Sequence, residues 1–105
     1  MRIRVNATED LIEILEGDDL TRLDLVCDNG SAELAAMLDR TGFGSLVADD
    51  QTLIDADQLR DLAEAGARSA DWSRRWQRMV HHAEQHGWTT PDGRSLYVHV
   101  VPADA

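Results

Sequence analysis

Residues 71–86 read DWSRRWQRMVHHAEQH and show the longest helical periodicity in the chain. On a helical wheel of about 100° per residue, the apolar side chains fall on one side. Apolar residues at i, i+4, i+7 and i+8 are what a helix needs in order to dock on a sheet. The stretch therefore predicts an amphipathic helix about 24 Å long, with its tryptophan face in the core. The predicted core positions are Trp72, Trp76, Met79, Val80 and Ala83.

A β-hairpin is predicted directly after this helix. Its strands are residues 88–90 and 94–101, and the turn between them reads Pro-Asp-Gly. Proline presets φ in such a turn, and Asp-Gly accepts positive φ. Along the second strand one face is formed by Leu96, Val98 and Val100, and the other by Tyr97, His99 and Val101.

The N-terminal part predicts a strand, a short helix and a second strand. The strands cover residues 2–6 and 22–27, and the helix begins after Thr8 as N-cap and ends at Gly17. This order suggests a right-handed βαβ unit whose two strands are parallel. The expected buried stripe of the helix is Leu11, Ile12, Ile14 and Leu15.

The middle of the chain predicts two more helices around a small hairpin at residues 46–54. The first helix covers residues 32–40. The second begins at Asp55, which forms a capping-box-like pattern with Gln58. Ser31 is the predicted N-cap of the first helix, and Gly42 follows its end. Gly66 ends the second helix.

Together these elements predict one domain, residues 1–105, of the α+β class. We expect two layers, a small mixed sheet of about four to six strands with about four helices packed mainly on one face.

Charge is distributed unevenly along the chain. Residues 1–67 carry five arginines against sixteen acidic residues, whereas residues 68–105 carry five against four; the net charge is −10. An anionic body disfavours nonspecific contact with DNA, RNA or anionic lipid and favours basic partners. The absence of lysine, with many alanines and more Asp than Glu, is typical of a high-GC bacterium.

Several features predict a cytoplasmic protein that does not contact the membrane. No apolar run approaches the ~18–20 residues of a membrane span, and the N-terminus lacks the apolar region of a signal peptide. The one cysteine, Cys27, cannot form an internal disulfide and therefore fits a reducing compartment.

The polar side of the helix at 71–86 is a candidate ligand site. Arg75, Arg78 and His82 follow at i, i+3 and i+7, and His86 lies at the boundary of this face. Forked guanidinium donors suit phosphates and carboxylates. The pattern permits an anion-binding protein or enzyme, although the commoner role of such a face is to be solvated and paired with nearby acids.

The same histidines permit a metal hypothesis, which we do not adopt. His82 and His86 are four residues apart, but Glu84 is one place too late for the zinc-peptidase pattern. A third ligand would have to be His99 or Cys27. No catalytic residue, metal or cofactor is predicted, because no nucleophile, phosphate-loop or dinucleotide motif is present.

A nucleic-acid alternative rests on a weak resemblance. Residues 62–66, followed by Ser69 and residues 72–76, superficially resemble a helix-turn-helix, and the last hairpin would be its wing. The spacing to Gly66 is one residue short, and the net charge opposes a polyanion. Nucleic acid is therefore an unlikely partner.

The function that composition favours is a non-enzymatic interaction module that engages a basic protein. Complementary charge accelerates such association, as in small acidic inhibitors of basic toxins. Self-association, with the basic helix of one copy on the acidic body of another, is the other partner hypothesis. The predicted partner-binding acids are Asp18, Asp19, Asp49 and Asp50.

Overall fold

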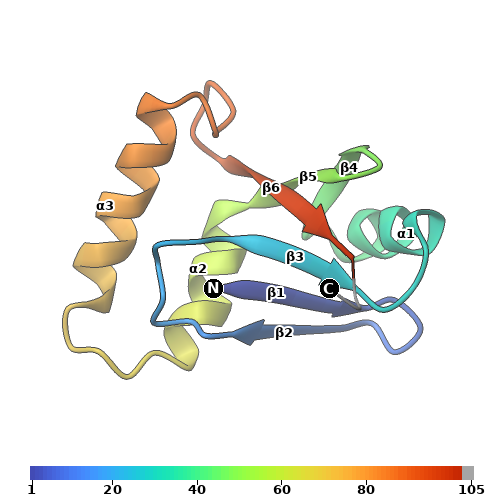
Figure 1. Ribbon diagram of the computed structural model, residues 1–105, viewed down its shortest axis with the longest axis horizontal. Helices are drawn as coiled ribbons and strands as arrows, with labels where there is room; N and C mark the ends of the chain where they lie inside the picture. The colour runs from blue at the N-terminus through green and yellow to red at the C-terminus, as the bar shows by residue number, and fades with distance from the viewer. Residues whose placement is uncertain (103–105) are drawn as a thin grey trace.

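Within residues 1–102, which the computed structural model describes, six strands form one mixed sheet in the order β2-β1-β3-β6-β5-β4 (Figure 1). β1 and β3 are parallel, as are β3 and β6, and the other three pairs are antiparallel. The strands are β1 (Arg2–Asn6), β2 (Leu11–Leu15), β3 (Asp24–Cys27), β4 (Gly44–Ala48), β5 (Gln51–Asp55) and β6 (Ser95–Val101).

The same residues contain three helices, α1 (Ser31–Thr41), α2 (Ala56–Ala65) and α3 (Trp72–Gln85). The α+β class and the mixed sheet are confirmed. The expectation of about four helices is wrong, because the first predicted helix is a strand.

That strand is β2, with the sequence LIEIL. It pairs with β1 in a hairpin, where Ile12 and Ile14 lie opposite Val5 and Ile3. The two isoleucines pack against the core, whereas Glu13 between them and Leu11 and Leu15 on either side are exposed. The burial period is therefore two and not 3.6, and β-branched isoleucine favours that extended geometry.

The turn that precedes β2 is stabilised by the side chain of Asn6. The Asn6 Oδ1 accepts hydrogen bonds from the backbone N–H groups of Thr8 and Glu9, at 3.1 and 3.2 Å. Asparagine commonly closes a turn in this way. Thr8 is consequently a turn residue and not a helix cap. The parallel pairing predicted for the strands on either side, β1 and β3, is confirmed.

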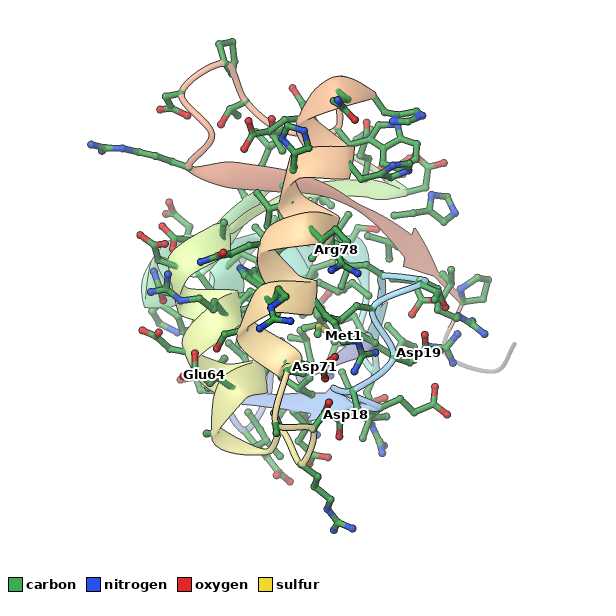
Figure 2. The ribbon with its side chains drawn as sticks, turned by 90° about the vertical axis from the view of Figure 1, so that its left-hand side faces the viewer. Met1, Asp18, Asp19, Glu64, Asp71 and Arg78 are labelled. Atoms are coloured by element: carbon green, nitrogen blue, oxygen red, sulfur yellow. The ribbon has the colours of Figure 1, made fainter. Side chains whose placement is uncertain are left out.

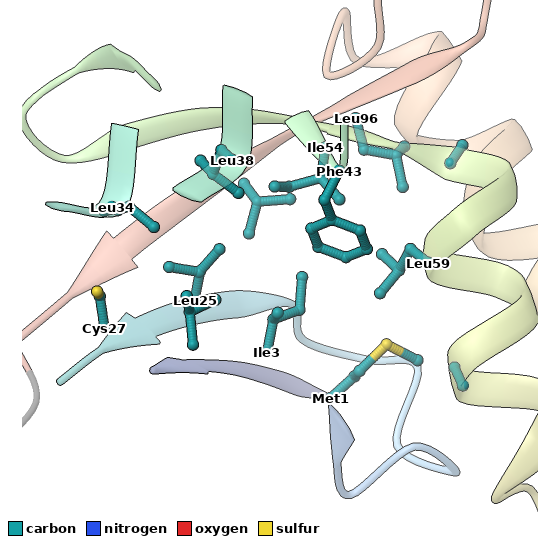
Figure 3. Packing of buried hydrophobic residues seen from close by; sticks show 14 of the residues in the cluster. Met1, Ile3, Leu25, Cys27, Leu34, Leu38, Phe43, Ile54, Leu59 and Leu96 are labelled. Atoms are coloured by element: carbon teal, nitrogen blue, oxygen red, sulfur yellow. The ribbon is translucent and has the colours of Figure 1, made fainter. Parts of the chain in front are cut away.

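One face of the sheet forms the hydrophobic core (Figure 3). Ile3 and Leu25 are paired across β1 and β3, and Leu96 lies on the same face of β6. α1 and α2 bury their apolar side chains here, together with Phe43 from the segment before β4. The helix residues involved include Leu34, Met37, Leu38, Leu59 and Ala63.

The opposite face of the sheet carries a row of polar residues set by the register. Arg2 lies beside Asp24, Asp24 beside His99, and His99 beside Gln51. The Asp24 carboxylate accepts two bonds from Arg2, at 2.8 and 3.1 Å, and one from Arg22 at 3.3 Å. The bond from Arg2 is the main cause of the lowered pKa of Asp24.

The predicted helix boundaries are largely confirmed. α2 begins after Asp55, whose Oδ1 accepts from the Gln58 N–H at 2.9 Å as the capping pattern predicts. α1 ends at Gly42, which has the left-handed φ of 71°. Its N-cap is Gly30, without a side-chain bond, so the predicted cap Ser31 is wrong.

Both predicted hairpins are also present. β4 and β5 form the first, over slightly longer strands than residues 46–54. In the second, Thr89 forms a bridge with Leu96, and β6 begins at Ser95. β6 belongs to the hairpin that would be the wing of a winged-helix protein. Because β6 lies between β3 and β5, it is a central strand of the sheet and not a wing.

Candidate functional site

Helix α3 is held by the loop between β2 and β3. Trp72 Nε1 donates to the carbonyl oxygen of Gly17 at 2.7 Å, and the Arg75 guanidinium donates to the carbonyl oxygen of Asp18. In return the Asp18 carboxylate accepts from the backbone N–H groups of residues 68–69 at 3.3 Å. These contacts place α3 beside the ends at which β1 and β3 begin (Figure 1).

The predicted tryptophan face of α3 is buried, as expected. Trp72 and Trp76 are 2% and 5% exposed, and their rings are stacked with centroids 5.5 Å apart. Ala83 is also buried, and Met79 and Val80 pack against the core. The helix therefore has two flanks, one on each side of this buried stripe.

The four residues of α3 predicted to bind a ligand do not form one set. Arg75 is half-buried and bonds the Asp18 carbonyl, so its guanidinium supports the fold. Arg78 is exposed one turn further along, on the flank of α3 that faces the loop of Asp18 and Asp19 (Figure 2). The two histidines, His82 and His86, lie close to each other at the C-terminal end of the helix.

These histidines form an exposed aromatic cluster with Trp88. The ring centroids of His82 and His86 are 4.2 Å apart, and His86 lies 4.8 Å from Trp88. His82 meets Trp88 edge-on at 5.7 Å. Trp88 is fixed by its backbone, because its N–H donates to the Ala83 carbonyl at 2.9 Å and its carbonyl accepts from the Tyr97 N–H at 2.8 Å. The sequence indicated the histidine pair but not its contact with Trp88.

The four acids predicted to bind a partner lie in two turns. Asp18 supports the docking of α3, as described above. Asp19 accepts bonds from the N–H and hydroxyl of Thr21, and these bonds lower its pKa. Asp49 and Asp50 are exposed in the turn between β4 and β5. The structure thus gives Asp18 and Asp19 intramolecular roles and leaves Asp49 and Asp50 at the surface.

A larger group of acids lies elsewhere, along an open groove of about 610 Å³ between α2 and α3. The α2 side presents three carboxylates at helical spacing, and Glu84 adds a fourth from α3. Trp76, Val80 and Ala56 contribute apolar surface between the two helices. The carboxylates are those of Asp57, Asp61, Glu64 and Glu84.

One guanidinium and one imidazole, those of Arg60 and His81, lie among these acids. The Arg60 guanidinium is 3.7 Å from the Asp57 carboxylate and 3.4 Å from that of Asp61. Glu64 and Glu84 lack such an ion pair within the part of the chain that the structure describes. The groove therefore carries a net negative charge with an apolar strip inside it. The spacing i, i+4 and i+7 on α2 was available in the sequence, but the facing flank of α3 follows only from the tertiary packing.

The other flank of α3 borders a second groove, of about 410 Å³. It lies between α3, residues 20–23 and the strands β5 and β6. The two grooves have no lining residue in common. The second is lined by Leu20, Thr21, Arg22, Leu23, Gln51, Met79, His82, Ala83, Trp88, Leu96, Tyr97 and His99.

Two further observations limit the possible chemistry. Among residues 1–102, no three His, Cys, Asp or Glu side chains lie close enough together to hold a metal ion. Cys27 is a free, buried cysteine, and burial raises the pKa of its thiol. Because the thiolate is the reactive form, this shift lowers the reactivity of Cys27.

No family model matches this chain, and neither a curated protein nor a solved structure is similar to it. No helix within residues 1–102 has the length and apolar character needed to cross a membrane.

Proposed function

We propose that this protein is a non-enzymatic interaction module that binds a basic segment of a partner protein in the groove between α2 and α3. The observation that carries the proposal is the composition of that groove. Four carboxylates and one guanidinium surround an apolar strip formed by Trp76, Val80 and Ala56. An Arg- or Lys-rich segment with one or two apolar residues is complementary to both parts.

The charges are placed where they favour association. Exposed acids on two adjacent helices create a negative field that extends about one Debye length, near 8–10 Å in physiological salt. Such a field raises the association rate of a basic partner and rejects acidic ones. The apolar strip, mainly Val80 because Trp76 and Ala56 are only 5% and 8% exposed, supplies short-range affinity that salt does not screen. The interaction is therefore expected to weaken in salt but not to vanish.

This site differs from the acids favoured by the sequence alone. Asp18 and Asp19 are engaged in the loop that holds α3, so their substitution would disturb the fold. Asp49 and Asp50 form an exposed pair in a separate open pocket, which also holds Asp28 and apolar residues such as Leu34 and Val100. We favour the helix groove because it presents four carboxylates, against three in that pocket.

Self-association is the alternative that deserves a direct test. The exposed Arg78 of one copy and the acidic groove of another have opposite charge. Sedimentation at low and high salt distinguishes the two partners. A dimer that dissociates in salt would favour a second copy over a different protein.

The main test compares two variants of equal charge. Glu64→Gln with Glu84→Gln removes two carboxylates from the groove, whereas Glu9→Gln with Glu13→Gln removes two exposed carboxylates near β2. Each variant and the wild type serve as bait in lysate of the source organism, at ~50 mM and ~500 mM salt. We expect basic proteins to be captured by the wild type and by the β2 variant, and to be reduced at least about fivefold for the groove variant.

The control variant has the same net charge as the groove variant, so a general electrostatic effect would reduce capture by both. Equal capture by both variants would place the interaction outside the groove. Capture of acidic proteins, or of none by the wild type, would contradict the proposed function itself.

A further inference from the structure

The second groove, on the other flank of α3, has a chemistry opposite to that of the acidic groove. Among the described residues that line it there is no aspartate or glutamate, although the chain has twenty acids and ten arginines. Its chargeable cationic groups are Arg22, His82 and His99. A patch without acids in so acidic a protein is suited to a ligand that acids would repel.

The charge of Arg22 is not cancelled by its neighbour. The Asp24 carboxylate already accepts two bonds from Arg2, one on each oxygen. Arg22 adds a second guanidinium to this single carboxylate, at 3.3 Å, and its side chain remains 60% exposed. The three side chains together carry one net positive charge at the edge of the groove.

The other acid near this edge, Asp19, is engaged as well. Its carboxylate accepts the hydroxyl and N–H of Thr21. These bonds orient the Asp19 carboxylate but leave its negative charge beside Arg22, so the acids near Arg22 lie at the rim and not among the residues that line the groove.

The groove also presents aromatic rings that are unusually accessible. Trp88 is 51% exposed and Tyr97 38%, whereas the other two tryptophans are buried. His82 and His86 pack against the Trp88 ring, and the backbone N–H and carbonyl of Trp88 are both hydrogen-bonded, which holds the backbone of this residue in place. A ring that is fixed before the ligand arrives loses little entropy on binding.

We propose that this groove binds a small, planar aromatic anion. The aromatic part of the ligand stacks on Trp88 and Tyr97, and its acidic group is bound by Arg22 and by the imidazole of His99. In the sheet, His99 lies between Asp24 of β3 and Gln51 of β5. The apolar residues Met79 and Leu23 line the same space. A volume of about 410 Å³ is within the ~300–1,000 Å³ typical of small-ligand sites.

Two kinds of natural compound share this chemistry, aryl carboxylates and mononucleotides. The test uses one probe for each, 2-naphthoate and adenosine monophosphate. Two matched compounds define the recognised groups: 2-naphthamide keeps the rings but lacks the charge, and cyclohexanecarboxylate keeps the charge but lacks the aromatic ring. Binding is followed by two-dimensional ¹H–¹⁵N NMR, in which the Trp88 indole N–H reports directly on the groove.

We expect at least one anionic aromatic probe to shift the Trp88 indole and Tyr97 amide signals with saturation below about 5 mM. Each matched compound should bind about tenfold or more weakly, because it lacks the charge or the stacking surface. Binding of only one of the two probes would identify the type of acidic group.

Two variants locate the site. Trp88→Leu and Arg22→Gln should each weaken binding of the probe about tenfold. The control Arg94→Gln removes an exposed positive charge that does not line the groove, so it should leave binding unchanged. Trp88 and Arg22 are both exposed, so these variants are expected to fold.

Three results would overturn this site: absence of shifts with both probes, equal binding of 2-naphthamide, or unchanged binding in Trp88→Leu. The proposal is independent of the acidic groove, since the two sites share no residue. The Glu64/Glu84 variant should bind the aromatic anion as the wild type does.

Discussion

Replacing Trp72 with phenylalanine tests the contact on which both grooves depend. The substitution removes the Nε1–H that donates to the Gly17 carbonyl at 2.7 Å, but keeps an aromatic ring in the core. A hydrogen bond of this kind contributes about 1 kcal/mol to the free energy of unfolding. Trp72 is only 2% exposed, so the smaller ring also leaves a void and loses apolar contact worth about 1 kcal/mol.

The expected loss is therefore about 2 kcal/mol. For a domain of this size, one kcal/mol lowers the melting temperature by ~4–8 °C, so the shift should be about 8–16 °C. Thermal unfolding followed by far-UV circular dichroism measures it, and urea unfolding gives the free energy directly. Trp88→Phe is the matched control, because the same chemical change at a half-exposed ring should cost less than about 0.5 kcal/mol.

Equal melting temperatures for the wild type and Trp72→Phe would refute this reasoning. It would mean that the Nε1–H bond to the Gly17 carbonyl and the part of the indole that phenylalanine lacks contribute nothing to the docking of α3. An equal loss in both variants would show that the effect comes from tryptophan as such and not from the contact with the loop.

Three other changes have predictable effects on stability. Gly44→Ala should lower the free energy of unfolding by at least about 2 kcal/mol, because the added Cβ would lie 2.1 Å from a backbone oxygen of β5. The control Gly66→Ala, whose added Cβ would meet nothing within 4 Å, should be nearly neutral in the same urea titration. Asp55→Ala should lower the free energy of unfolding by about 1 kcal/mol through loss of the α2 N-cap, and melting unchanged from the wild type would count against that role. The pKa of Asp24 is lowered from its ordinary 3.8, mainly by the bond from Arg2. The contribution of ionised Asp24 to the free energy of unfolding is therefore present above pH ~4 and is lost as the pH falls through the folded-state pKa. Asp24→Asn should therefore flatten the acid side of a stability–pH curve, and an acid limb as steep as that of the wild type would contradict this assignment.

The sequence predicted the elements whose signals are local. The tryptophan stripe defined α3 within one residue at each end, and the Asp55–Gln58 pattern gave the start of α2. The alternation along residues 94–101 separated the two faces of β6, and the face of Leu96 and Val98 is the buried one. In each case the pattern repeats with the period of the element or depends on residues within one helical turn of each other.

The failure at β2 has a specific cause. The sequence LIEIL is compatible with two structures. Its apolar residues at i, i+1, i+3 and i+4 fit one side of a helix, and its two isoleucines fit the buried face of a strand. A five-residue apolar run does not distinguish these periods. The Asn6 side chain, which bonds two N–H groups of the following turn, was the local signal that favoured a hairpin.

The candidate sites were less predictable because they depend on contacts between distant residues. Trp72 and Gly17 are 55 positions apart, yet their bond determines which flank of α3 faces α2. The position of β6 between β3 and β5 likewise brings Tyr97 and His99 next to residues 20–23. No periodicity in the chain encodes these neighbours.

The charge asymmetry seen in the sequence has a different meaning in three dimensions. Its simplest interpretation is an acidic body with one cationic helix on its surface. In the structure one of these cations is engaged by the loop, since the Arg75 guanidinium donates to the Asp18 carbonyl oxygen, while the Asp18 carboxylate accepts from backbone N–H groups where α3 begins. The flank of α3 that faces α2 contributes Glu84 to an acidic groove, and the other flank contributes His82 to a groove without acids. Because one helix forms a wall of both, a change that rotates α3 would alter both sites together, whereas substitutions at either rim should affect only one.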